Sequence, residues 1–206
     1  MAVKKSVFRE YFESLVIAVG LALFVRTWVF QAFKIPTGSM EPNLLVGDHL
    51  IVNKAIFSPT ATGMERAIMP HRDIRHGEVI VFKWPKDPTR DFIKRVIGLP
   101  GDTIELRRKK VYVNGQVQDE PYAHFLYPLS PDTGKRSDDL KEEYGPVTVP
   151  PGQFFVMGDN RDNSDDSRYW GFLPATYVKG KALFIYFSVG DSVSDVQFSR
   201  LLNRVR

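Results

Sequence analysis

Three short segments carry the residue types that could do chemistry. The first is PTGSMEPNLLVGD at residues 36–48, where Ser39 lies in a loop punctuated by Pro and Gly. The second is the apolar run FIKRVIGL, which contains Lys94, and the third is GDNRDNSDDSRYWG at residues 158–171. Most serines in such loops only form turns, so Ser39 taken alone does not indicate catalysis.

A catalytic serine needs a base, and the usual Ser-His-Asp arrangement is missing. The sequence has no GxSxG motif, and His49 lies in a strand pattern with no aspartate placed to orient it. Lys94 is an alternative base, because alternation along a strand puts it on one face with Phe92 and Val96. Burial lowers a lysine pKa by up to roughly 3 to 5 units, which would let the neutral amine accept a serine proton. A lysine on an edge strand, pointing into water, is the competing interpretation.

The third segment contains four Asp, two Asn, two Ser and two Arg within residues 158–171. A calcium loop is one interpretation, but neither Asp159 nor Asp162, taken as its first position, is followed by Gly at the sixth or Glu at the twelfth. We expect instead that hydrogen bonds and an Asp–Arg pair hold this loop together.

The composition excludes several functional classes. The chain has 206 residues, 43% of them apolar, and a formal charge of +4, which allows one folded domain, either alone or with a smaller appendage. Cysteine is absent, and the four histidines show no HxxH or HExxH spacing, so no metal site and no cofactor are expected. The basic residues are scattered rather than clustered, which argues against nucleic acid as a partner.

The elements that must position these residues begin with an apolar segment. Residues 14–33 are long enough to cross a lipid bilayer, with Arg26 as the one charge and Trp28 at the expected depth of an aromatic belt. No A-x-A cleavage site follows, so a permanent anchor is predicted rather than a removable signal peptide. A buried core helix is the alternative.

Basic residues before the span set its predicted orientation. Lys4, Lys5 and Arg9 place residues 1–13 in the cytoplasm by the positive-inside rule, and residues after Phe33 on the outer side.

The rest of the chain is predicted to form β-strands. Short alternating or continuous apolar runs are bounded by Gly, Pro and Asp, and Asn114–Gly115 between β-rich arms predicts a hairpin. The predicted fold is therefore mainly β: an antiparallel catalytic sheet with a small hairpin and loop appendage, behind one transmembrane helix. The predicted parts after the anchor are a β core at 34–106 and 151–189, an inserted appendage at 107–150 and a C-terminal tail at 190–206. We expect the tail arginines Arg200, Arg204 and Arg206 to be solvated, with contact to lipid headgroups as the alternative.

Four motifs together resemble one enzyme family. SMEPNL, GDHLIVNK, RDFIKRVIGLPGD and GDNRDNSDDSRYWG, in this order behind an apolar segment, resemble the bacterial type I signal peptidases, or leader peptidases, which are Ser-Lys dyad serine proteases. The resemblance covers residues 33–57, 75–102 and 152–187, and it extends neither to 123–150 nor to the tail after 189.

The resemblance implies specific roles for six positions. Ser39 would be the nucleophile and Lys94 the general base, and the Thr37 hydroxyl and the Ser39 N–H would stabilise the oxyanion. Ser164 would orient the base, and Asp166 and Arg168 would form a structural ion pair.

The resemblance also implies the substrate. Preproteins carrying signal peptides would bind by strand addition and be cut on the outer side of the cytoplasmic membrane, after small residues at the first and third positions before the cut. Partners would be these preproteins and the lipid bilayer, with the enzyme as a monomer. The apolar pockets would be lined by Phe33, Ile35, Met40, Leu44, Phe92 and Ile93.

Three other functions stay open. Within the same chemistry, the chain could be a processing peptidase for pili or conjugation factors, or a self-cleaving Ser-Lys repressor-type protease, although the span argues against the last. A membrane-anchored β domain that only binds peptides is the non-enzymatic alternative.

Overall fold

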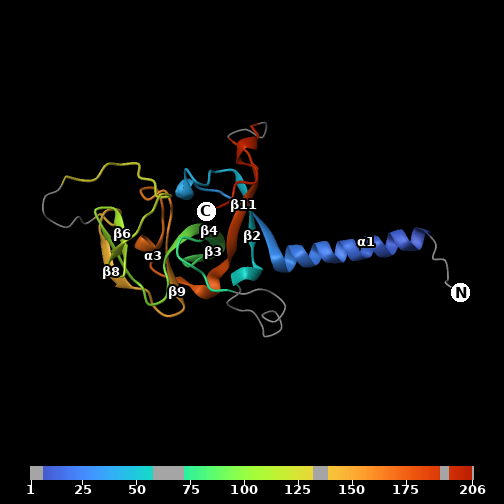
Figure 1. Cartoon of the computed structure of the whole chain (residues 1–206), viewed down its shortest axis with the longest axis horizontal. Helices are drawn as coiled ribbons and strands as arrows, with labels where there is room; N and C mark the ends of the chain where they lie inside the picture. Colours follow the sequence, from blue (N-terminus) through green and yellow to red (C-terminus); the bar gives the residue numbers. More distant parts are fainter. Residues whose placement is uncertain (1–6, 58–71, 132–138, 191–194, 206) are drawn as a thin grey trace.

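A computed structural model describes residues 7–57, 72–131, 139–190 and 195–205. These residues form one N-terminal helix that projects from a β domain containing two antiparallel sheets (Figure 1). The predicted fold class, mainly antiparallel β behind one apolar helix, is confirmed.

The N-terminal half runs α1 (Val7–Phe24), a π-helical turn η1 (Val25–Val29), β1 (Phe30–Lys34), the 3-10 turn η2 (Gly38–Met40), β2 (Asp48–Asn53), η3 (Ala55–Phe57), β3 (Val79–Trp84) and β4 (Asp87–Gly98). The C-terminal half runs β5 (Thr103–Arg107), β6 (Lys110–Val113), β7 (Gln116–Val117), β8 (Tyr144–Thr148), β9 (Gln153–Met157), α3 (Ser167–Trp170), β10 (Leu173–Pro174), η4 (Ala175–Tyr177), β11 (Val178–Ser188) and η5 (Phe198–Arg200).

The larger sheet has seven strands in the order β1-β2-β11-β3-β4-β9-β10. Its centre is buried on both faces, which explains the continuous apolar runs in the sequence. In β3, Val79 and Val81 belong to one hydrophobic cluster, whereas Ile80 and Phe82 belong to another on the opposite face. This alternation follows from the two-residue period of a strand and gives β4 an apolar environment on both sides.

The smaller sheet has the order β7-β6-β5-β8 and lies at the end of the molecule far from α1 (Figure 1). The predicted hairpin is confirmed, since Asn114 and Gly115 both have positive φ and join β6 to β7. A third apolar cluster joins the two sheets by packing Ile104 and Leu106 of β5 with Phe155 of β9. Strand β5 begins at Thr103 and pairs with β6 and β8 rather than with a strand of the larger sheet.

The N-terminal helix differs from the predicted span of residues 14–33 at both ends. The helical segment Val7–Val29 has 23 residues and contains an 18-residue stretch with a mean hydropathy of 1.7, so it is long and apolar enough to cross a membrane, and the packed domain buries none of that stretch. Helical structure includes the polar turn before Ser14, where Arg9 pairs with Glu13 one turn later at 2.8 Å. Residues 30–33 are in β1 instead, because β1 hydrogen-bonds to β2 and so becomes an edge of the sheet.

The C-terminal tail is part of the fold. Backbone hydrogen bonds join Ile185 of β11 to Leu202 and Asn203, so the tail folds back along β11. This brings Arg200 to the buried carboxylate of Asp48, with 2.6 Å between Nη2 and Oδ2. The expectation that Arg200 is solvated is therefore wrong, because a buried carboxylate favours a paired cation. Arg204 is exposed, and Arg206 lies outside the described residues.

Candidate active site

Ser39 and Lys94 meet in the fold although 55 residues separate them in the sequence. Ser39 lies in η2, directly after β1, and Lys94 lies in the buried half of β4. The Lys94 amine donates to Ser39 Oγ at 2.7 Å and to the carbonyl oxygen of Ile93 at 3.0 Å. Both side chains are buried, with 6% of Ser39 and 3% of Lys94 exposed. A buried amine in direct contact with a hydroxyl is the geometry required of a general base and its nucleophile.

The environment of Lys94 disfavours its charged form. Burial lowers the pKa of Lys94 to about 8, although the negative charges of Asp166, Asp165 and Asp159 act in the opposite direction. The amine also lies 5.2 Å from the centroid of the Phe92 ring. With a pKa near 8, roughly one amine in ten is neutral at pH 7, and that fraction rises steeply with pH.

The loop after β9 holds the backbone of the Ser39 turn. The N–H of Asn160 donates to the Ser39 carbonyl oxygen at 3.1 Å, and Asn160 Nδ2 donates to the Gly38 carbonyl oxygen at 3.3 Å. At Gly158 there is no room for a side chain, because a Cβ there would overlap with the Ser39 carbonyl oxygen and with Ser164 Oγ. The two loops can therefore pack this closely only with glycine at position 158.

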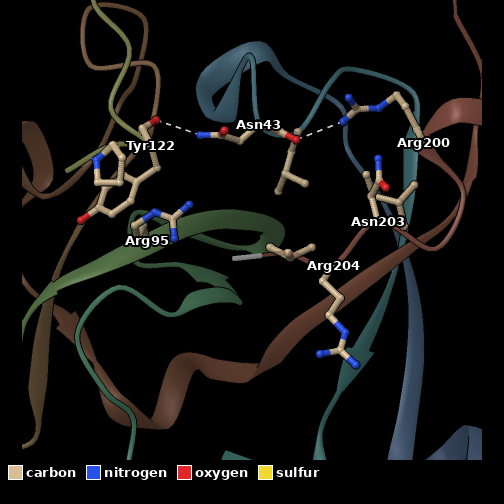
Figure 2. A pocket seen from close by; sticks show the side chains of 10 residues that line it. Asn43, Arg95, Tyr122, Arg200, Asn203 and Arg204 are labelled. Carbon is tan, nitrogen blue, oxygen red and sulfur yellow. Dashed lines mark hydrogen bonds between the residues drawn. The ribbon is translucent and has the colours of Figure 1, made fainter.

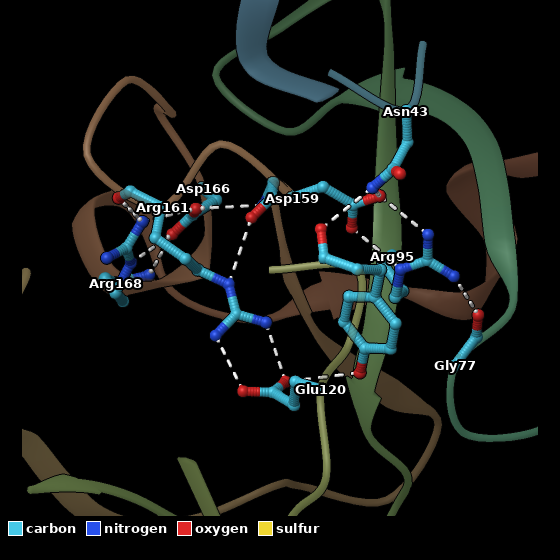
Figure 3. A network of polar contacts seen from close by, with 10 residues as sticks. Asn43, Gly77, Arg95, Glu120, Asp159, Arg161, Asp166 and Arg168 are labelled. Carbon is cyan, nitrogen blue, oxygen red and sulfur yellow. Dashed lines mark hydrogen bonds and ion pairs between the residues drawn. The ribbon is translucent and has the colours of Figure 1, made fainter. Parts of the chain in front are cut away.

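Asp166 and Arg168 form the Asp–Arg pair expected in this loop. The Arg168 guanidinium donates twice to Asp166, at 2.9 and 2.8 Å, and both side chains are fully buried (Figure 3). Burial would raise the pKa of Asp166, but the charge and hydrogen bonds of Arg168 lower it. Asp166 also accepts from the Gly158 N–H at 3.1 Å, so the ion pair shapes the segment that contacts Ser39.

Ser164 lies near these groups without bonding to the base. Its buried hydroxyl has no hydrogen-bond partner within the part of the chain that the structure describes, although it lies near enough to Asp166 to contribute to that low pKa. The bond between Ser164 and Lys94 that the resemblance implies is therefore not formed here; the Lys94 amine instead donates to Ser39 Oγ and to the Ile93 carbonyl oxygen.

A second buried ion pair lies one residue beyond Lys94. Arg95 donates to Asp159 through two bonds, at 2.7 and 2.6 Å, and to the carbonyl oxygen of Gly77 at 2.7 Å. Asn43 completes the group by donating to Asp159 at 2.9 Å (Figure 3). The sequence analysis considered Asp159 only as a possible calcium ligand, and it did not predict a pair between Asp159 and Arg95. The sequence feature that could have indicated their pairing is that Arg95 lies within an apolar strand and Asp159 lies just after one. A charge in such a buried environment needs a partner.

Thr37 is placed close to the dyad. It precedes η2 with an extended backbone, and this exposed residue lines a cavity of about 290 Å³. The same cavity is lined by Lys94. The Thr37 hydroxyl and the N–H of Ser39 belong to the same loop, two residues apart, on either side of Gly38.

The residues predicted to line apolar pockets fall into two groups. Phe92 and Ile93 line the cavity beside Lys94, together with Pro36 and residues 90 and 91. The other predicted lining residues pack in the hydrophobic cluster under β1 and β2; they are the buried Ile35, Met40 and Leu44 and the half-buried Phe33.

A separate cavity of about 330 Å³ lies behind the nucleophile loop. It is lined by Asn43, Arg95, Tyr122 and the tail, including Arg200 and Asn203 (Figure 2). Asn43 Nδ2 donates to the Tyr122 carbonyl oxygen at 2.8 Å, and Arg200 donates to the Asn43 carbonyl oxygen at 3.0 Å. The tail therefore helps to hold the loop that carries Ser39.

Comparison with known proteins places this chain in a family. Residues 8–187 match the sequence model of the family described as signal peptidase, peptidase S26. A probable signal peptidase I-2 from Synechocystis is 39% identical over 87% of this chain and 73% of its own length. Signal peptidase I from Aquifex aeolicus is 36% identical over 87% of this chain and 84% of its own length. A solved signal peptidase I from Enterococcus faecalis is 32% identical and covers 53% of this chain and 97% of its own, with a TM-score of 0.40. Because the family model matches most of the length of this chain, the chain belongs to the signal peptidases of family S26.

Proposed function

We propose that this chain is a membrane-anchored serine endopeptidase that removes signal peptides from exported preproteins, with Ser39 as nucleophile and Lys94 as general base. The observation that carries the proposal is the 2.7 Å contact between the buried Lys94 amine and Ser39 Oγ. An amine with a lowered pKa accepts a proton near neutral pH, whereas a solvated lysine does not.

The reaction runs in two halves. Neutral Lys94 takes the proton of Ser39 Oγ as the oxygen attacks the scissile carbonyl carbon, and the negative oxygen is stabilised by the Ser39 N–H and the Thr37 hydroxyl. The C–N bond then breaks, and Lys94 returns the proton to the leaving amine, which leaves an ester on Ser39. In the second half, Lys94 deprotonates a water that attacks the ester, and the acid product and free Ser39 result.

The substrate is proposed to add as a strand to β4. Residues 87–95 of β4 pair with β3 along one edge, and β9 covers the other edge only from Arg95 onward. Within the described residues, the second edge of β4 before Arg95 is therefore unpaired beside the Lys94 amine. An extended peptide could complete this edge with backbone hydrogen bonds, with small side chains at the first and third positions before the cut fitting the apolar pockets.

The anchor supports the same function. Val7–Val29 would hold the enzyme in the membrane that also holds the signal sequence, which raises their effective concentration. We propose that residues 1–13 face the cytoplasm and that the β domain lies on the outer side of the cytoplasmic membrane.

The test uses the full-length protein in detergent and a purified preprotein. Ser39→Ala and Lys94→Ala should each abolish cleavage, while the exposed control variants Ser199→Ala and Lys110→Ala should retain it. Sequencing the new N-terminus of the product identifies the cut, and thermal unfolding checks that each variant is folded. Near-normal turnover by Ser39→Ala or Lys94→Ala would refute the dyad, and no cleavage by the unsubstituted protein would favour a peptide-binding domain.

Orientation needs a separate measurement. The chain has no cysteine, so one introduced by Gln116→Cys at an exposed site in β7 is a unique label. A membrane-impermeant maleimide should label it in intact cells or spheroplasts. Labelling only after lysis would place the domain on the cytoplasmic side.

A further inference from the structure

Arg90 is a cation at the active-site cavity that the proposed reaction does not use. Its side chain is exposed and lines the cavity of about 290 Å³ that also contains Thr37 and Lys94. The neighbouring acid on this cavity, Asp91, is already paired with Lys179 at 2.7 Å. The ion pairs formed by the described residues do not include Arg90, so its guanidinium donors are available.

A carboxylate in the same strand does not neutralise this arginine. Hydrogen bonds from Thr89 account for most of the lowered pKa of Asp87, and the charge of Arg90 contributes less. Asp87 Oδ1 accepts both the N–H of Thr89 at 3.1 Å and its hydroxyl at 2.6 Å. The Asp87 carboxylate is thus engaged within its own turn.

Two aromatic rings hold Arg90 in place. Its Cζ lies 5.2 Å from the Trp84 ring centroid and 5.5 Å from that of Phe92. The two rings are themselves stacked, with centroids 5.0 Å apart and an angle of 8° between their planes. A guanidinium held against rings keeps its N–H groups free at its edge, where they can bind a carboxylate with two parallel hydrogen bonds.

The strand places Arg90 along the path proposed for the substrate. Arg90, Phe92 and Lys94 are spaced by two residues on β4 and share one face. At about 3.3 Å per residue, Arg90 lies roughly 13 Å along the strand from the position of Lys94. The unpaired edge of β4 spans this interval, so an extended peptide cut at Ser39 would pass Arg90.

We propose that Arg90 is a specificity-determining residue that binds the side-chain carboxylate of an Asp or Glu in the substrate, about three to five residues from the scissile bond. This inference rests on the proposed function, because it requires a peptide along β4. A peptide is favoured over an anionic lipid headgroup because Arg90 shares one cavity with Lys94 and Thr37.

The test measures kcat/KM for soluble peptides with one cleavage site, using the full-length protein in neutral detergent at low salt. Each peptide carries Gln, Glu or Lys at one position within about six residues of the cut. We expect Glu to be preferred over Gln by about threefold to fivefold at one position, the size of an exposed ion pair. High salt should remove the preference, since it screens exposed charges.

Two variants make the test selective. Arg90→Gln should abolish the preference for Glu, and Arg90→Glu should reverse it in favour of Lys at the same position. Lys110→Glu changes the net charge equally at an exposed site of the smaller sheet and should keep the original preference. A reversal of this kind is not produced by a general loss of stability.

The outcomes separate this inference from the proposed function. If all Gln peptides are cut normally and no position prefers Glu, the role of Arg90 is refuted and the peptidase function stands. If Arg90→Glu slows every peptide equally, the residue has no role in specificity. A preference that appears only with anionic lipid vesicles would assign Arg90 to the membrane surface and overturn the proposal. No cleavage of any peptide or preprotein by the unsubstituted protein would refute the function itself.

Discussion

The backbone N–H of Asn160 donates to the carbonyl oxygen of Ser39, with 3.1 Å between the two atoms. This bond joins the loop after β9 to the turn that carries the proposed nucleophile. Asn160 Nδ2 also donates to the Gly38 carbonyl oxygen at 3.3 Å, which belongs to the peptide unit that contains the Ser39 N–H. The orientation of this N–H, one of the proposed oxyanion donors, therefore depends on a loop more than a hundred residues away in the sequence.

Gly158→Ala should disturb this contact. The added Cβ would overlap with the Ser39 carbonyl oxygen and Ser164 Oγ, so backbone must shift. We expect kcat/KM to fall at least about tenfold and the free energy of unfolding to fall by about 1 to 3 kcal/mol, as for other overpacked sites. Gly20→Ala is the control, because nothing lies within 4 Å of a Cβ at that position. Unchanged kinetics for Gly158→Ala would show that the two loops move independently.

The rate should depend on pH through Lys94. Since burial lowers its pKa to about 8, the active neutral amine is lost as pH falls below that value. We expect kcat/KM to rise with pH, reach half its maximum near pH 8 and then level off. A midpoint near that of a solvated lysine would contradict a buried base.

A single carboxylate should move that midpoint in a known direction. Asp165 is exposed, and its negative charge raises the Lys94 pKa. Asp165→Asn should therefore shift the midpoint to lower pH. Asp119→Asn, at an exposed site in the loop after β7, should leave it in place.

Thr37→Val tests the second oxyanion donor. Loss of one such donor typically lowers kcat by about 10² to 10³-fold with little change in KM. Thr37→Ser keeps the hydroxyl and should retain most of the activity. If Thr37→Val turned over normally, another group would have to stabilise the oxyanion.

Asp159→Asn should destabilise the fold. Arg95 and Asp159 are both buried, with 2% and 0% of their side chains exposed, so the substitution removes the negative charge that faces a buried guanidinium. Removing one partner of such a pair typically costs about 3 to 5 kcal/mol. Lys179→Ala breaks a partly exposed pair with Asp91 and should cost less. Chemical denaturation of both variants would measure the difference, and equal losses would show that burial does not matter here.

Local patterns in the sequence were enough to predict several features of this protein. The length and apolarity of the N-terminal segment predict a helix able to span a membrane, alternating residues predict the strands, and Asn114–Gly115 predicts the hairpin. These features depend on residues close together in the chain, which the sequence displays directly. Ser39 and Lys94 also stand out in the sequence, as a loop serine and a lysine among apolar residues, and the motifs around them resemble those of the signal peptidases.

The tertiary structure decided which of these residues meet and how deeply they are buried. Packing on both faces of β4 removes water from Lys94 and so lowers its pKa, an effect that the identity of the residue does not contain. Pairing with β2 converts residues 30–33 from the predicted span into a strand. The partners Arg95 and Asp159 are 64 residues apart, and Arg200 and Asp48 are 152 apart. Such contacts depend on how distant segments fold together, because the free energy of a buried charge is set by its neighbours in space rather than in the chain.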